Sequence, residues 1–122
     1  MQEDRISGEK TERFALNELM ERVDEDDELI REVLEIFLED TPSTLEALKT
    51  GITDQSAEAV AKAAHTLKGA SANIAANRLR DQAYELELRA KSGELADAGG
   101  IYAALETEYA ALKKHLNKYL GK

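Results

Sequence analysis

The chain of 122 residues contains no cysteine and only one proline, and aromatic residues make up 5% of it. The absence of cysteine excludes a disulfide framework and thiol chemistry, and it is consistent with a reducing compartment. No apolar run approaches the roughly 20 residues that a membrane-spanning helix needs, and residues 1–10 lack the apolar stretch of a secretion signal. We therefore expect a cytoplasmic protein.

Acidic residues outnumber basic ones by 25 to 16, which gives the chain a formal net charge of −9. A charge of this sign opposes binding to nucleic acid and to anionic membrane surfaces, because both carry negative charge themselves. We therefore expect no nucleic-acid partner and no direct contact with a membrane.

Apolar residues recur at spacings of three and four along most of the chain, which predicts amphipathic helices. The predicted helices span about 12–21, 27–50, 56–74 and 77–92, and a last helix begins between residues 95 and 101. Four long helices with short links predict an all-α, antiparallel up-and-down four-helix bundle, with the short additional N-terminal helix capping one end. We expect residues 1–10 to form a flexible tail and residues 11–122 to form the bundle.

A few residues mark the expected ends and bends of these helices. Pro42 removes a backbone donor and clashes with the preceding turn, so we expect a kink near Leu38, with a break as the alternative. Asp54 or Ser56 is expected to cap the third helix, and Asn77 is expected to cap the fourth.

His65 is one of two histidines and opens the run His-Thr-Leu-Lys-Gly at residues 65–69. An unprotonated imidazole is a competent nucleophile near pH 7. At about 100° per residue, His65 points roughly 140° away from the apolar stripe of the predicted third helix. The ring is therefore expected to face solvent. The stripe consists of residues 60, 64, 67, 71 and 74.

Basic and small residues share the outward face with His65. Lys62 and Lys68 lie three residues on either side of it, where they can balance the negative charge of a phosphoryl group. A glycine in mid-helix costs about 1 kcal/mol relative to alanine, so Gly69 needs a reason, and access to the ring is the simplest one. The alternative is an ordinary exposed histidine beside solvated lysines, with Gly69 permitting tight helix packing.

Residues 63–74, which read Ala-Ala-His-Thr-Leu-Lys-Gly-Ala-Ser-Ala-Asn-Ile, are followed by Arg78 and Leu79. This stretch closely resembles the histidine-containing phosphotransfer (HPt) domain of two-component phosphorelays. Residues 37–42 are similar to the second-helix segment of the same family, and the order of predicted elements over residues 14–120 matches it as well. The resemblance therefore covers nearly the whole chain.

This resemblance implies a bundle in which His65 accepts a phosphoryl group, Lys68 supports that group and Gly69 keeps the ring accessible. Family domains receive the group from an aspartate of one receiver domain and pass it to an aspartate of another. The receivers provide the magnesium ion and most catalytic groups, so we expect this chain to bind no metal or cofactor. The family often has glycine where this chain has Ala75, so we expect the following turn to differ slightly.

The sequence has no Gly-rich phosphate loop and no Walker-type lysine motif, so autophosphorylation from ATP is not expected. We expect a monomeric phosphotransfer protein rather than an ATP-using kinase, with response-regulator receiver domains and a hybrid histidine kinase as its partners. One alternative is direct phosphorylation by a kinase catalytic domain, as in chemotaxis kinases. Another is a non-catalytic helical adaptor. The chain could stand alone or be the cytoplasmic module of a membrane-anchored hybrid kinase.

The surface around His65 is expected to dock the receiver. Ala61, Gly69 and Ala72 could form a shallow surface for a receiver helix, with an ordinary small-residue surface as the alternative. On the fourth helix, Gln82 and Glu87 are both candidates for a hydrogen bond that orients the imidazole.

We expect the other polar clusters and the tyrosines to have structural roles. The acidic residues 24–28 lack the spacing and central glycine of a calcium loop, so we favour helix capping. Neither histidine follows a glutamate by three residues, which argues against a di-metal bundle, and His115 is expected to be structural or merely exposed. Core or edge packing is favoured for the four tyrosines, which are Tyr84, Tyr102, Tyr109 and Tyr119.

Overall fold

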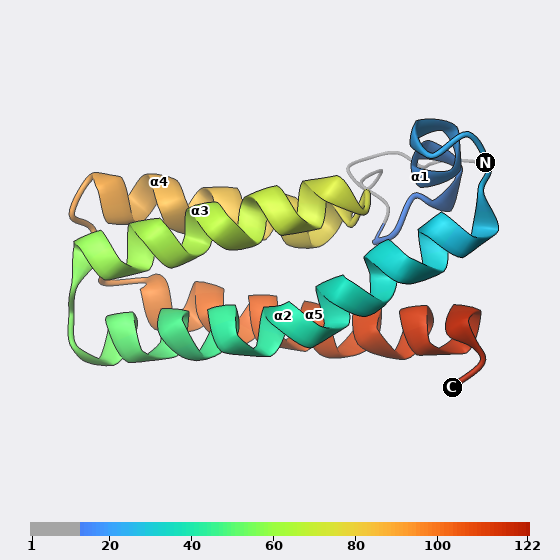
Figure 1. Ribbon diagram of the computed structural model, residues 1–122. Coiled ribbons are helices and arrows are strands. Elements are labelled where there is room, and N and C mark those ends of the chain that lie inside the picture. The colour runs from blue at the N-terminus through green and yellow to red at the C-terminus, as the bar shows by residue number, and fades with distance from the viewer. Residues whose placement is uncertain (1–12) are drawn as a thin grey trace, which may run out of the picture.

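The computed structural model describes residues 13–122, which fold into five helices with no strand among them (Figure 1). The all-α prediction is therefore confirmed. The predicted flexible tail, residues 1–10, lies outside the described residues, as does residue 12, where the first helix was expected to begin. None of the five helices is long and apolar enough to cross a membrane. Their bounds are α1 Leu16–Arg22, α2 Asp27–Thr53, α3 Ala57–Asn73, α4 Asn77–Lys91 and α5 Ala98–Leu120.

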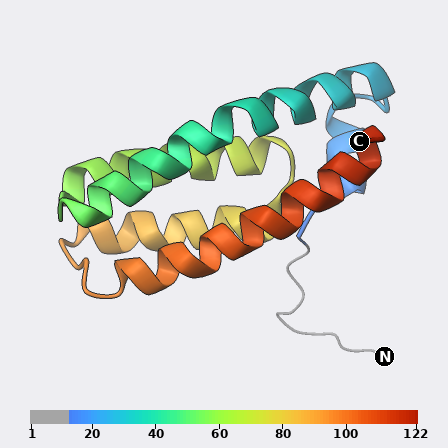
Figure 2. The ribbon, with the colours of Figure 1, turned by 90° about the horizontal axis from the view of Figure 1, so that it is seen from below.

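The four long helices form an up-and-down bundle. Each packs against its neighbour in the chain, and α5 returns to pack against α2. Figure 1 shows α3 and α4 above α2 and α5, and Figure 2 shows the same arrangement from below. In both views α2 and α5 extend beyond the ends of α3 and α4, and α1 lies across this extension. The predicted bundle with a short helix at one end is thus confirmed.

The outward direction of His65 follows from the core stripe of α3. All five residues predicted for this stripe are buried, because each packs against the neighbouring helices. Burying a large apolar side chain contributes about 1.5–3 kcal/mol, so rotating α3 about its axis would forfeit several such terms at once. The stripe therefore fixes the rotation of α3, and with it the direction of every residue on the opposite face. Its members are Val60, Ala64, Leu67, Ser71 and Ile74.

The segment that contains α1 covers the carboxyl end of α3. The Ala15 N–H donates to the Ala75 carbonyl at 2.9 Å, and the Arg22 guanidinium donates to the carbonyls of Ala72 and Asn73. The last carbonyls of a helix have no partner within the helix, so Arg22 supplies the donors that they lack. These bonds explain why a helix of 7 residues, too short to be stable alone, keeps its place.

The prediction that Asn77 caps α4 is wrong. Ala76 takes the N-cap position without a side-chain cap bond, and Asn77 is the first residue of the helix. The buried Asn77 amide instead donates to Glu18 of α1 at 3.4 Å and accepts from Arg80 at 2.8 Å. Because α1 packs against this turn, the Asn77 side chain bonds to Glu18 instead of capping α4. For α3 the cap is Ser56, whose hydroxyl accepts from the backbone N–H three residues later.

Pro42 lies inside α2 without breaking it. Figure 1 shows α2 changing direction along its length while the helix stays continuous. The proline ring cannot donate to the Leu38 carbonyl, which accounts for a bend at this level. The buried Thr41 hydroxyl donates to the Phe37 carbonyl at 2.6 Å on the core side of the same turn. The predicted kink is therefore present, and the alternative of a break is excluded.

Ala75 forms the turn between α3 and α4 in a left-handed backbone conformation, with φ of 58°. This conformation costs a residue with a Cβ roughly 1–2 kcal/mol, whereas glycine adopts it readily. Alanine is held there because it is fully buried and because its carbonyl accepts the Ala15 N–H. Tertiary contacts thus maintain the turn without glycine.

Candidate functional site

His65 lies in the middle of α3 on the face opposite the core stripe, and 66% of its side chain is exposed. The predicted outward direction is therefore confirmed. The position is rigid, because the residues before and after it in α3 are anchored by the buried stripe. The ring is thus presented to solvent from a fixed backbone.

Glu87 of α4 holds one side of the imidazole. Its Oε2 lies 2.9 Å from His65 Nδ1, while the Glu87 side chain is only 2% exposed. Of the two residues considered for this role, it is therefore Glu87 rather than Gln82 that contacts the ring. A bond from α4 to α3 ties the ring orientation to the packing of two helices.

Two lysines share the Glu87 carboxylate with His65. Lys68 Nζ lies 2.8 Å from Oε1, and Lys91 Nζ lies 3.1 Å from Oε2. Lys91 was missed by the sequence reasoning, although its spacing of four residues after Glu87 on one helix was a usable signal. One carboxylate thus gathers three basic side chains.

Glu87 is ionised under all ordinary conditions. Burial of the carboxylate raises its pKa, but Lys68, Lys91 and His65 together lower it further, and the pKa of Glu87 falls to about 2 from its usual 4.5. An ionised carboxylate accepts hydrogen bonds and cannot donate them. The proton in the His65–Glu87 bond therefore belongs to Nδ1 of the ring.

This proton placement defines the chemistry open to His65. With Nδ1 protonated and bonded to Glu87, a neutral ring carries its free lone pair on Nε2. The arrangement is that of a nucleophile oriented by a buried carboxylate, in which positive charge that develops on the ring is stabilised by the carboxylate.

Lys62 and Lys68 lie on opposite flanks of His65. Lys68 is partly covered, with 28% of its side chain exposed, and it is tied to α4 through Glu87. Lys62 is exposed and makes no ion pair within residues 13–122. Lys68 and Lys91 carry one positive charge each, and both pair with the single negative charge of Glu87. Positive charge is therefore in excess beside the ring, although the net charge of the chain is −9.

Gly69 lies in open space one turn after His65. A Cβ built on Gly69 would meet no atom within 4 Å outside its own stretch of helix. The alternative that this glycine permits tight helix packing is therefore excluded. Its absent side chain leaves the surface beside the ring clear for a group that approaches from outside.

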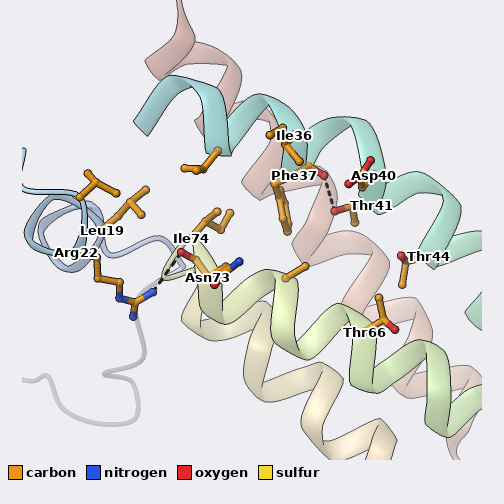
Figure 3. Close-up of a pocket in the computed structure, with 13 residues that line it drawn as sticks. Leu19, Arg22, Ile36, Phe37, Asp40, Thr41, Thr44, Thr66, Asn73 and Ile74 are labelled. Carbon is orange, nitrogen blue, oxygen red and sulfur yellow. Dashed lines mark hydrogen bonds between the residues drawn. The ribbon is translucent and has the colours of Figure 1, made fainter. Parts of the chain in front are cut away.

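A groove of about 530 Å³ borders the Lys62 side of His65, where α1, α2 and α3 meet (Figure 3). Thr66, next to His65 in the sequence, lines one end of it, and Arg22 lies at the other. The sequence reasoning missed this groove because three helices contribute to it. Its apolar lining includes Leu19, Val23, Val33, Ile36, Phe37 and Ile74.

Two of the three residues predicted to form the docking surface, Ala61 and Ala72, lie on the other flank. Ala61 and Ala72 are half-buried and, by helical spacing, share the side of α3 that carries Lys68. Gly69 lies on the side of the groove. The small residues therefore surround His65, and the apolar surface lies to one side of it.

The other polar clusters have structural partners. Asp26 caps α2 by accepting from the Leu29 N–H, as expected for the acidic residues 24–28. His115 is exposed and lies edge-on against Phe14, with the ring centroids 5.7 Å apart. Within residues 13–122, no group of three or more histidine, cysteine, aspartate or glutamate side chains could hold a metal ion.

Comparisons with known proteins agree with this geometry. Residues 32–115 match the family model described as the Hpt domain. The fold is similar to the crystal structure of histidine-containing phosphotransfer protein B (HptB) from Pseudomonas aeruginosa PAO1, with a TM-score of 0.82 and 25% sequence identity over 88% of this chain and 93% of that one. Among curated proteins, none matches the chain significantly.

Substituting Glu87→Gln tests the carboxylate through the pH dependence of stability. Because the pKa of Glu87 is about 2 in the fold, against 4.5 ordinarily, its ion pairs stabilise the chain fully above pH 4.5 and are lost as the pH falls toward 2. At pH 7 the variant should lose about 1–3 kcal/mol of unfolding free energy. Urea unfolding at several pH values between 7 and 3 measures this loss, which should shrink as the pH falls.

Glu85→Gln is the matched control for this experiment. Glu85 lies on the same helix, is 54% exposed and pairs with Arg89 at 3.4 Å. A surface pair of this kind contributes at most about 1 kcal/mol, so its removal should change stability little. A loss for Glu87→Gln that stayed constant from pH 7 to pH 3 would contradict the assignment.

Substituting Gly69→Ala should stabilise the chain. The added methyl group meets no neighbour, and alanine is preferred over glycine within a helix, so the free energy of unfolding should rise by about 0.5–1 kcal/mol. Denaturant unfolding measures the change. Ala59→Gly, at an exposed position of the same helix, should have the opposite effect. A destabilised Gly69→Ala variant would show that the fold itself needs the glycine.

Proposed function

Because the chain belongs to the Hpt domain family of phosphorelay carriers, we propose that His65 accepts a phosphoryl group from an aspartate of one receiver domain and passes it to an aspartate of another. The observation that carries this proposal is the exposed imidazole whose Nδ1 is bound by the buried Glu87 carboxylate. That bond leaves Nε2 as the nitrogen that can attack.

In the proposed step, the Nε2 lone pair attacks phosphorus while the P–O bond to the donor aspartate breaks. An N–P bond forms, and the donor leaves as a carboxylate. The ring keeps its Nδ1 proton and gains positive charge, which the ionised Glu87 stabilises across 2.9 Å. The return step reverses these changes when the acceptor aspartate attacks.

The lysines have different proposed roles. Lys68 is held beside the ring by Glu87 and supports the phosphoryl oxygens once the group is bound to Nε2. Lys62 is exposed on the groove side, where it can compensate charge as the donor approaches. The magnesium ion and the remaining catalytic groups are assigned to the receiver, and one copy of this chain supplies the groups named here.

Receiver docking is proposed on the surface around His65. An in-line transfer requires the aspartyl phosphate to reach Nε2 at close range, and the small residues Ala61, Gly69 and Ala72 leave room for it. The neighbouring groove offers an apolar surface of the kind found at the centre of protein interfaces. An amphipathic receiver helix that covers this groove would bring its domain over the histidine.

Substituting His65→Gln should abolish phosphorylation without unfolding the chain, because the side chain is exposed. The chain is incubated with phosphorylated receiver domains from the same organism, and acid-labile phosphate on it is measured. His115→Gln is the matched control, since His115 is the other histidine and is also exposed. Undiminished labelling of His65→Gln would refute the proposal.

The same assay separates the proposed donor from the alternatives. Labelling by an isolated receiver domain supports the relay, whereas labelling only by a histidine kinase catalytic domain with ATP supports direct phosphorylation. Partner binding that is unaffected by His65→Ala, with no phosphohistidine under any condition, would support the alternative that the chain is a non-catalytic helical adaptor.

Substituting Ile36→Asp tests the groove. Ile36 lines the groove and is 50% exposed, so the change should spare the fold while it places a charge in the proposed interface. The kcat/KM for transfer from a receiver should fall about tenfold, which corresponds to ~1.4 kcal/mol. Leu29→Asp, also on α2 and 39% exposed but outside the groove, is the control. Equal effects of the two changes would argue against docking in the groove.

A further inference from the structure

Tyr84 contacts Lys68, and this contact has no part in the transfer step described above. It lies on α4 three residues before Glu87, and it is 48% exposed, although core or edge packing was expected for it. The Lys68 ammonium lies over its ring, with Nζ 4.8 Å from the ring centroid. A cation at this distance from an aromatic face is attracted by the negative potential of the ring.

Lys68 therefore has two different partners on α4. Glu87 Oε1 lies 2.8 Å from Nζ and is buried, whereas the Tyr84 ring is half exposed. Residues three apart on a helix share one face, so the carboxylate and the ring contact the ammonium from adjacent turns. The long lysine stem would otherwise sample many rotamers.

We infer that Tyr84 is a positioning residue for Lys68: its ring holds the ammonium at the surface beside His65, where the phosphoryl group will be bound. The inference rests on the proposed function, in which Lys68 supports that group. The attraction of the carboxylate alone would draw the ammonium toward a buried site, and the ring offers a second partner nearer to solvent. As a result 28% of the Lys68 side chain stays exposed while its freedom is restricted.

The ring suits this role because its hold is weak and reversible. A cation–π contact at an exposed site is weaker than a charge-assisted hydrogen bond from an ammonium to a phosphoryl oxygen. Lys68 can thus turn to the phosphoryl group when it arrives, with less rotamer freedom to lose at that moment. Loss of the ring should therefore slow transfer rather than speed it.

The test compares Tyr84→Phe with Tyr84→Leu. Phenylalanine keeps the ring face, and leucine keeps an apolar side chain without it. With a receiver domain that phosphorylates the wild-type chain, Tyr84→Leu should lower the kcat of transfer about two- to fivefold at unchanged KM, and Tyr84→Phe should match the wild type. Equal rates in all three chains, or a faster Tyr84→Leu, would overturn the inference.

A double variant separates positioning from docking. In a Lys68→Gln background the ring has no ammonium to hold, so Tyr84→Leu should cause no further loss. A loss that persists in this background, or a Tyr84→Leu effect confined to KM, would show that Tyr84 contacts the receiver instead, and this would refute the positioning role.

A spectroscopic measurement reports the contact without any transfer. The Lys68 ε-methylene protons should be shifted upfield by the ring current in the wild type and in Tyr84→Phe, and this shift should vanish in Tyr84→Leu. Unshifted protons in the wild type would refute the contact. If the shift is present but the wild-type chain is never phosphorylated on His65, the proposed function fails while the geometry of Lys68 stands.

Discussion

A single buried carboxylate, that of Glu87, organises the polar contacts around His65. Moving an ionised carboxylate out of water is costly unless charged partners surround it, and Glu87 has three basic partners on two helices. Its bond to Nδ1 sets the proton on His65, and its ion pairs place positive charge beside the ring. The orientation of the His65 ring and the local charge therefore both depend on the contact between α3 and α4.

The packing of the bundle fixes the contact between α3 and α4. The buried stripe fixes the rotation of α3, and the packing of α3 on α4 brings Glu87 to the level of His65. At the far end, the bonds of Ala15 and Arg22 to the carboxyl end of α3 keep α1 in place. These bonds also complete the apolar groove, because α1 supplies one of its walls. The His65 ring and the adjoining groove are thus held by the same scaffold.

Much of this could be predicted from residue spacing. The helices, the buried stripe and the exposed histidine all follow from a period of 3.6 residues, and the run around His65 pointed to the family. Asn77 shows where such reasoning fails. It has the side chain of a good helix cap, but α1 packs against the turn and engages that side chain through Glu18. The preference of asparagine for the helix cap was therefore outweighed by a contact with a residue 59 positions away in the sequence.

The amino-acid sequence by itself determined the helical elements and the outward direction of His65, because both depend on the rotation from one residue to the next. Only the tertiary structure decided that Glu87 binds the ring, that Lys68 reaches the same carboxylate, and that Tyr84 lies under the Lys68 ammonium. These contacts depend on how α3 and α4 are rotated and shifted against each other. That arrangement is set by the packing of the whole core, and no local pattern in the sequence contains it.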